Sequence, residues 1–242
     1  MTEPDFTKGP EAEAGDHALA LAKVAASLVP IAGGLAVELL GLIQSPLETK
    51  MREWVEDLAV RLRVLEERVE GFSFEQLAGN DDFQSTFLYA SQLAVRTTQE
   101  SKRDALRNIV LNTALNRTPD EDLRLMFMNY IDSFTSWHLR VLSVLDELDG
   151  WTNKYYSLHP TWNWDEPMTV IDFALPEIKD REDLLRQLLR DLHARGLITK
   201  DDYHVTVVTT QSGRKPLFVS QTTTMGKQFL QYIAEPSPDA EQ

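Results

Sequence analysis

The chain of 242 residues contains no cysteine. This absence excludes a disulfide framework, thiolate catalysis and cysteine-ligated zinc, and it is typical of proteins in a reducing cytosol. Long apolar runs are missing too: the longest stretch without a charge near the N-terminus, residues 24–37, has 14 residues, whereas a membrane-spanning helix needs about 20. Residues 1–16 lack the basic segment of a secretory signal. We expect a cytoplasmic protein, free or held at the inner face of the membrane.

Basic residues are scarce. The chain has 24 Lys and Arg against 38 Asp and Glu, a net charge of −14, which opposes general affinity for nucleic acid because such binding neutralises phosphates. The deficit is uneven: residues 176–234 hold nine basic and seven acidic residues, leaving 15 and 31 for the rest of the chain. Only the C-terminal part is therefore a candidate DNA-binding surface.

Apolar periodicity predicts a mainly α-helical protein. The clearest stripe steps by three and four residues, which places it on one face of a helix over 47–70 that begins at Pro46. Its members are Met51, Val55, Leu58, Leu62, Leu65 and Val69. Because the stripe covers fewer than three heptads, it indicates packing in a helical bundle over 16–148 more than a coiled-coil seam. The flanks 1–15 and 235–242 are polar and proline-containing, which predicts disordered tails.

Capping signals predict further helices of the bundle. Asn80 or Asp81 is expected to cap a helix that runs on or breaks near Thr97-Thr98. Thr118 and Pro119 are expected to begin a helix over 119–132, with Thr118 as its cap and the proline at its first position.

The N-terminal part of the bundle is predicted to be an apolar helical hairpin over 19–43. Proline ends or kinks a helix, and paired glycines permit a tight reversal. This hairpin is either an ordinary part of the core or a segment that leaves the core to engage a membrane or a partner. The residues that would make such contacts are Val24, Leu28, Pro30, Ile31, Gly33, Gly34 and Leu35.

Aromatic residues gather in 149–167, which we interpret as an ordered connecting loop. Pro160 and Pro167 act as helix breakers within it. Rings of this size are seldom left in water, so the loop is expected to dock the C-terminal module on the bundle, with ligand stacking as the alternative. Its docking residues are Trp151, Tyr155, Tyr156, Trp162 and Trp164.

Residues 168–234 follow the order of a winged-helix module: helix, helix, Gly196-Leu197-Ile198, β-hairpin, helix. The longer helix is expected over 180–195 with Gly196 as its cap, and the last helix over 224–233. The apolar residues of the longer helix are Leu184, Leu185, Leu188, Leu189 and Leu192. Such a module either binds DNA or makes protein contacts. The basic residues for the first role are Arg186 and Arg190 on the longer helix and Arg214 and Lys215 at the hairpin tip. The net charge favours the second role.

Few residues are arranged for chemistry. Asn108, Asn112 and Asn116 lie four apart, a polar stripe that binds a ligand, pairs helices or faces solvent. The five histidines show no metal-binding spacing, and neither a catalytic triad nor a phosphate-binding loop is present in the sequence. We therefore predict no catalytic, cofactor-binding or metal-binding residues, and a protein that is not an enzyme.

Several short motifs together resemble a known family. They are Val29-Pro30-Ile31-Ala32-Gly33-Gly34 with Glu38-Leu39-Leu40, the segment Trp137-His138-Leu139-Arg140-Val141-Leu142, Gly196-Leu197-Ile198, and Thr224-Met225-Gly226-Lys227-Gln228-Phe229-Leu230. In layout the chain is similar to bacterial helical proteins of the abortive-infection Abi-alpha type. The resemblance implies a cytoplasmic protein of phage defence and assigns no catalytic residue. The hairpin is also similar to the N-terminal bundles of membrane-disrupting cell-death proteins.

The sequence thus predicts a non-enzymatic interaction or effector protein. It would engage a membrane surface, a protein partner or a second copy of itself, without a cofactor. The alternative is a winged-helix transcriptional regulator that binds DNA.

Overall fold

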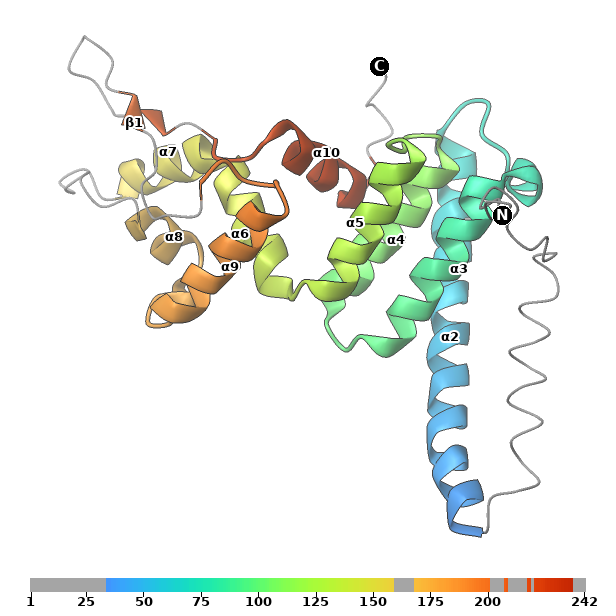
Figure 1. The fold of residues 1–242 in the computed structure, drawn as a ribbon. Helices are drawn as coiled ribbons and strands as arrows, with labels where there is room; N and C mark the ends of the chain where they lie inside the picture. The colour runs from blue at the N-terminus through green and yellow to red at the C-terminus, as the bar shows by residue number, and fades with distance from the viewer. Residues whose placement is uncertain (1–33, 159–167, 201–206, 209–216, 219, 237–242) are drawn as a thin grey trace, which may run out of the picture. The chain divides into compact units, whose positions relative to one another are not determined.

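The computed structural model describes residues 34–158, 168–200, 207–208, 217–218 and 220–236. This part of the chain is mainly helical, as predicted (Figure 1). Its helices are α2 (Gly34–Arg68), α3 (Asp81–Arg96), α4 (Glu100–Ala114), α5 (Glu121–Ser133), α6 (Ser136–Asp146), α7 (Leu148–Leu158), α8 (Met168–Ala174), α9 (Glu182–Ala194) and α10 (Thr224–Ile233), with short 3-10 helices at Phe74–Gly79 and Pro176–Ile178. Two strands, β1 (Val207–Val208) and β2 (Leu217–Phe218), pair antiparallel.

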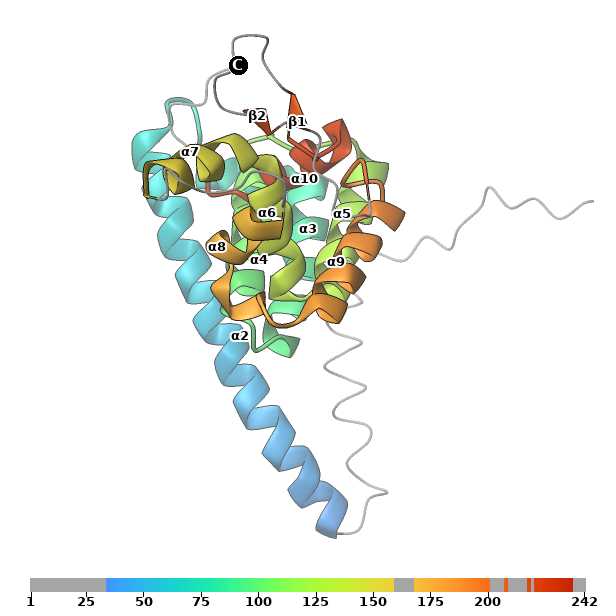
Figure 2. The same cartoon turned by 90° about the vertical axis from the view of Figure 1, so that its left-hand side faces the viewer.

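The chain divides into two compact units, Met1–Arg52 and Glu53–Gln242. The predicted bundle over 16–148 and the predicted module over 168–234 both contribute helices to the second unit. The reason lies in the contacts of the last helices: α9 packs against α6, and α10 packs against α4 and α6. Figures 1 and 2 both show α9 beside α6.

Helix α2 is continuous across Pro46, where a separate helix was predicted to begin. Proline inside a helix removes one backbone hydrogen bond, and the helical turns on both sides maintain the helix because propagation is favourable once it has formed. Helix α2 begins at Gly34, which was predicted to belong to the hairpin's reversal, and continues through Leu35. The predicted hairpin residues 24, 28, 30, 31 and 33 lie outside the described residues.

The stripe on α2 is confirmed in part. Leu58, Leu62 and Leu65 are buried, but Val55 is 38% exposed and Trp54 is fully buried. The indole Nε1 of Trp54 donates a hydrogen bond to Ser91 Oγ of α3 at 3.0 Å. At this turn the buried residue is therefore Trp54, one residue before the predicted Val55. The large indole ring and its polar partner decide the rotation of the helix here.

Local capping and turn residues set where α3 and α5 begin and where α4 ends. Asn80 caps α3 by accepting a hydrogen bond from Phe83 N at 2.9 Å, as predicted. Helix α5 begins later than its Thr118-Pro119 signal indicated, because Asp120 accepts from Leu123 N and serves as its N-cap. Helix α4 ends before Asn116, whose φ of 56° lies in the left-handed region that asparagine tolerates.

The described residues do not support the predicted winged-helix module. Its helix α9 forms, and four of the five predicted leucines, Leu185, Leu188, Leu189 and Leu192, are buried, while Leu184 is half-buried. The strands, however, are two residues long, with Val207 opposite Phe218 and Val208 opposite Leu217. Residues 201–206 and 209–216 of the predicted hairpin lie outside the described part. The last helix, α10, packs on α4 of the predicted N-terminal bundle. Its contacts are therefore not confined to a C-terminal module.

Candidate functional site

The described part of the predicted aromatic loop, residues 149–158, is helical. Trp151, Tyr155 and Tyr156 lie on α7, and Trp162 and Trp164 lie outside the described residues. The ring of Trp151 meets Phe173 of α8 edge to face, with 6.4 Å between centroids, and Lys154 lies 5.0 Å over the same ring. The loop prediction was wrong over 149–158, because these residues form a helix that packs against α8.

Two of the predicted DNA-contacting residues, Arg186 and Arg190, lie one turn apart on α9. Arg186 forms an ion pair with Glu182 one turn earlier, at 2.6 Å, and Arg190 is exposed. Arg214 and Lys215 lie outside the described residues. A phosphate would compete with Glu182 for Arg186, and the DNA-binding role stays a prediction.

The asparagine stripe on α4 holds the end of α10. Asn112 Nδ2 donates to the carbonyl oxygens of Tyr232 and Ala234, both at 2.9 Å, and Asn108 Nδ2 donates to Ile233 O at 2.9 Å. These are carbonyls at the C-terminus of α10, which have no partner within the helix. Of the three roles left open for the stripe, the structure shows helix pairing for Asn108 and Asn112, and a turn role for Asn116.

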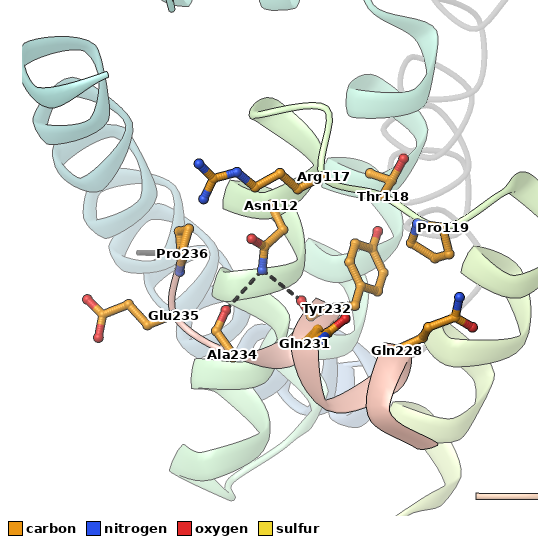
Figure 3. A pocket seen from close by; sticks show the side chains of 10 residues that line it. All are labelled: Asn112, Arg117, Thr118, Pro119, Gln228, Gln231, Tyr232, Ala234, Glu235 and Pro236. Carbon is orange, nitrogen blue, oxygen red and sulfur yellow. Dashed lines mark hydrogen bonds between the residues drawn. The ribbon is translucent and has the colours of Figure 1, made fainter. Parts of the chain in front are cut away.

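Beside this junction lies a pocket of about 480 Å³, here called the α10 pocket (Figure 3). It is formed by the end of α4, the α4–α5 connection and the C-terminal half of α10, and its lining residues are Asn112, Arg117, Thr118, Pro119, Gln228, Gln231, Tyr232, Ala234, Glu235 and Pro236. The volume is in the range of small-molecule sites. The sequence singled out Asn112 as part of the polar stripe and indicated Thr118 and Pro119 only as a helix start. It did not predict that the other residues would line a pocket with them, because the contributing segments are more than 100 residues apart.

Two walls of the α10 pocket are held rigidly. The hydroxyl of Tyr232, which is buried, lies 2.9 Å from Thr113 Oγ1 of α4. Burial raises the pKa of Tyr232 above its usual range, so this phenol is neutral at physiological pH. The backbone N–H of Arg117 donates to Asn112 O at 2.9 Å. This hydrogen bond joins the α4–α5 connection to the end of α4 at Arg117, whose side chain lines the pocket.

Two buried arginines pair with carboxylates between helices. Arg107 of α4 lies 2.6 Å from Asp57 of α2 and also pairs with Asp104 and Glu100. Its guanidinium lies 5.5 Å from the Trp54 ring. Such pairs fix the relative positions of the helices that carry them, and breaking one leaves an uncompensated charge.

Arg124 of α5 forms the second pair, with Asp82 at the start of α3. This hydrogen bond lowers the pKa of Asp82 below its usual range. The carboxylate is thereby kept charged, which suits a structural partner of arginine.

His138 joins α6 to α9. Its Nδ1 accepts a hydrogen bond from Thr135 N at 3.0 Å, so the proton of the neutral ring is on Nε2, which lies 3.3 Å from Asp191 Oδ2. The ring stacks on Phe134 with 4.6 Å between centroids. Burial lowers the pKa of His138 below its usual range, against the opposing effect of Asp191.

The burial of His138 predicts that the folded protein loses stability in mild acid. Because the folded-state pKa is below the unfolded value, the unfolded chain binds more protons as the pH falls through that value, and folding becomes less favourable. A His138→Gln variant can keep the cap through its amide oxygen but does not titrate. We expect urea unfolding at pH 5.5 and 7.5 to show a smaller acid-induced loss for this variant. An equal loss in both proteins would show that His138 does not contribute.

The described part of the chain contains no group of three or more His, Asp or Glu residues placed to hold a metal ion. None of the described helices combines the length and the apolar character needed to cross a membrane. Comparison of the sequence with protein-family models and curated proteins, and of the chain with solved structures, finds no match. The resemblance to the Abi-alpha type therefore stays a prediction.

Proposed function

We propose that this protein is a non-enzymatic effector that engages a membrane surface through the N-terminal segment of α2. The observation that carries the proposal is the continuity of α2. Residues 34–47, here called the apolar segment, contain one charged residue, Glu38, and belong to the same helix as the buried residues Trp54 to Leu65.

The composition of the apolar segment suits the surface of a membrane. Successive helical residues are about 100° apart, so the apolar residues distributed over 35–37, 39–40 and 42–43 occupy more than half of the helix circumference, and Glu38, Gly41 and Ser45 share the remaining face. A helix with a broad apolar face and a narrow polar face is suited to lie at the membrane interface, with its apolar face in the acyl region and its polar face toward the headgroups.

The length of the apolar segment limits how far it can insert into a bilayer. Fourteen residues span about 21 Å as a helix, less than the roughly 30 Å of a bilayer core. The proposal is therefore partial insertion from one side, with the charged residues Glu48, Lys50 and Arg52 that follow the segment remaining in the interface. A role in phage defence, which the Abi-alpha resemblance implies, is part of the same proposal.

The experiment is vesicle flotation of the full chain with two matched double variants. Leu35→Glu with Leu39→Glu adds two charges to the apolar segment. Val55→Glu with Val60→Glu adds the same charge to the same helix at positions that are 38% and 61% exposed. We expect the wild type and the second variant to float with neutral phosphatidylcholine vesicles and the first variant to remain in solution, because each buried carboxylate costs several kcal/mol. Circular dichroism confirms that both variants are folded.

Other outcomes would overturn the membrane proposal. One is wild-type protein that remains in solution with both neutral and anionic vesicles. Another is equal flotation of the two variants. Soluble oligomers that only the first variant loses, without flotation, would assign the apolar segment to self-association.

A further inference from the structure

The outer face of α3 carries an inference that is independent of the membrane proposal. Five residues of this helix recur at intervals of three or four positions and therefore share one side of it. All five are exposed, and they are Asp81, Ser85, Leu88, Gln92 and Arg96. We propose that this outer face, with the neighbouring edge of α5, binds the same face of a second copy of the chain in an antiparallel, symmetric dimer.

The other sides of α3 are covered by the protein's own helices. Ala90 is fully buried, and Ser91 accepts the indole hydrogen bond of Trp54 from α2. Toward α5, Asp82 pairs with Arg124. These contacts fix the rotation of α3 about its axis and direct the outer face away from the core, where another molecule can reach it.

The centre of the proposed interface is apolar. Leu88 is 48% exposed and Leu125 of α5 is 52% exposed. The hydroxyl of Tyr89 donates to Asn129 Oδ1 of α5 at 3.2 Å. Leu125 lies between Arg124 and Asn129, the two residues of α5 that form these bonds with α3. The two leucines therefore flank one junction between helices, and a dimer would remove both from water.

The charges of the outer face are self-complementary. Asp81 lies seven residues before Leu88 and Arg96 lies eight residues after it, so opposite charges stand about 10 and 12 Å along the helix from one apolar centre. When two copies cross antiparallel at Leu88, Asp81 of each copy meets Arg96 of the other, and Ser85 meets Gln92. A parallel arrangement would bring like charges together, which is unfavourable. The pattern of charges thus selects a second copy in the antiparallel orientation.

Arg96 can make this contact while keeping its neighbour in the same chain. Its guanidinium lies 3.9 Å from Asp132 of α5, and the two side chains are 68% and 46% exposed. An exposed pair of this kind contributes little to stability, and a guanidinium has five N–H donors, so a second carboxylate can bind beside the first. One helix face and the edge of another form a small interface, for which a weak, concentration-dependent dimer is expected.

Sedimentation equilibrium of the full chain without lipid, from micromolar to millimolar concentration, tests the dimer. We expect the wild type to convert reversibly from monomer to dimer as its concentration rises. Leu88→Asp places a carboxylate at the centre of the interface and should weaken dimerisation at least about tenfold. Leu158→Asp makes the same change on α7 at a position that is 60% exposed, and this control should dimerise like the wild type.

Exchanging the charges tests the antiparallel pairing. Asp81→Arg and Arg96→Glu each bring like charges together in a dimer of identical chains, so each variant alone should dimerise at least about tenfold more weakly than the wild type. In an equimolar mixture, both contacts between an Asp81→Arg chain and an Arg96→Glu chain join opposite charges. The mixture should therefore form a heterodimer with an affinity close to that of the wild type. Circular dichroism confirms that each variant is folded.

The inference is overturned if the wild type stays monomeric over the whole concentration range, or if Leu88→Asp dimerises as tightly as Leu158→Asp. It is also overturned if the mixture of charge variants associates no better than each variant alone. The variant Leu35→Glu with Leu39→Glu should still dimerise, and loss of its dimer would assign self-association to the apolar segment of α2 instead. Vesicle flotation does not depend on the outer face of α3, so the failure of one proposal leaves the other standing.

Discussion

Replacing Phe229 by alanine is expected to destabilise the protein by about 4 kcal/mol, since large-to-small changes of a buried phenylalanine cost about 3–5 kcal/mol. Phe229 on α10 is fully buried. Its ring meets Phe127 edge to face at 5.2 Å and also packs edge to face on Tyr130 and Phe134, at 6.1 and 6.2 Å between centroids. The substitution removes these ring contacts and leaves a cavity where α10 enters the core.

Equilibrium urea unfolding followed by circular dichroism measures this loss. The control is Lys227→Ala, an exposed position two residues earlier on α10, which should change stability by no more than about 0.5 kcal/mol. If Phe229→Ala were no more destabilising than this control, α10 would not be packed against α5 as the structure shows.

The second large effect is expected from Gly226→Ala. A methyl group on Gly226 would overlap the backbone oxygen of Leu197 and lie 2.5 Å from Thr222 Cγ2. Backbone atoms cannot yield as a flexible side chain does, so α10 would have to move away from the turn after α9. We expect a loss of about 2–3 kcal/mol, the upper part of the range for overpacking.

Gly150→Ala is the matched control for this prediction. Gly150 lies in α7, and nothing would come within 4 Å of the added methyl group. Because alanine favours the helix more than glycine does, this variant should be stabilised by up to about 1 kcal/mol. Thermal and urea unfolding of both variants measure whether stability falls in Gly226→Ala and rises in Gly150→Ala. Destabilisation of similar size in both would show that the cost at Gly226 is a general effect of losing glycine.

The two predictions concern the start and the middle of α10. Gly226 lets the start of α10 approach Leu197, whose carbonyl accepts from Thr223 N at 3.0 Å. Phe229 fills the core in the middle of the helix, and Asn108 and Asn112 satisfy its last carbonyls. Each type of residue performs a different physical task, and together they explain why a helix of ten residues is held firmly enough to form one wall of a pocket.

Local signals in the sequence predicted the helices well. Helix α10 has the predicted bounds, α9 buries four of its five predicted leucines, and the break near Thr97 separates α3 from α4. Gly196, predicted to cap α9, has a φ of +70°. Periodicity, caps and positive-φ glycines act over a few residues, so a single sequence contains the information needed to place them.

Errors arose where a local signal had more than one physical outcome. Pro46 was expected to start a helix and lies inside α2. Trp151 was assigned to a loop because of its size and is part of α7. In both cases the backbone conformation depended on the total stability of a long helix or on the packing of a neighbouring one, which no short pattern contains.

The sequence by itself determined the mainly helical class, most helix boundaries and the leucine face of α9. Only the tertiary structure decided that α10 returns to α4, that Asn108 and Asn112 cap it, and that Arg117 and Glu235 line one pocket. The reason is physical: hydrogen bonds within a helix join residues three or four apart. Asn112 and Tyr232, in contrast, are 120 residues apart, and their hydrogen bond exists only once the core around Phe229 has brought the two helices together.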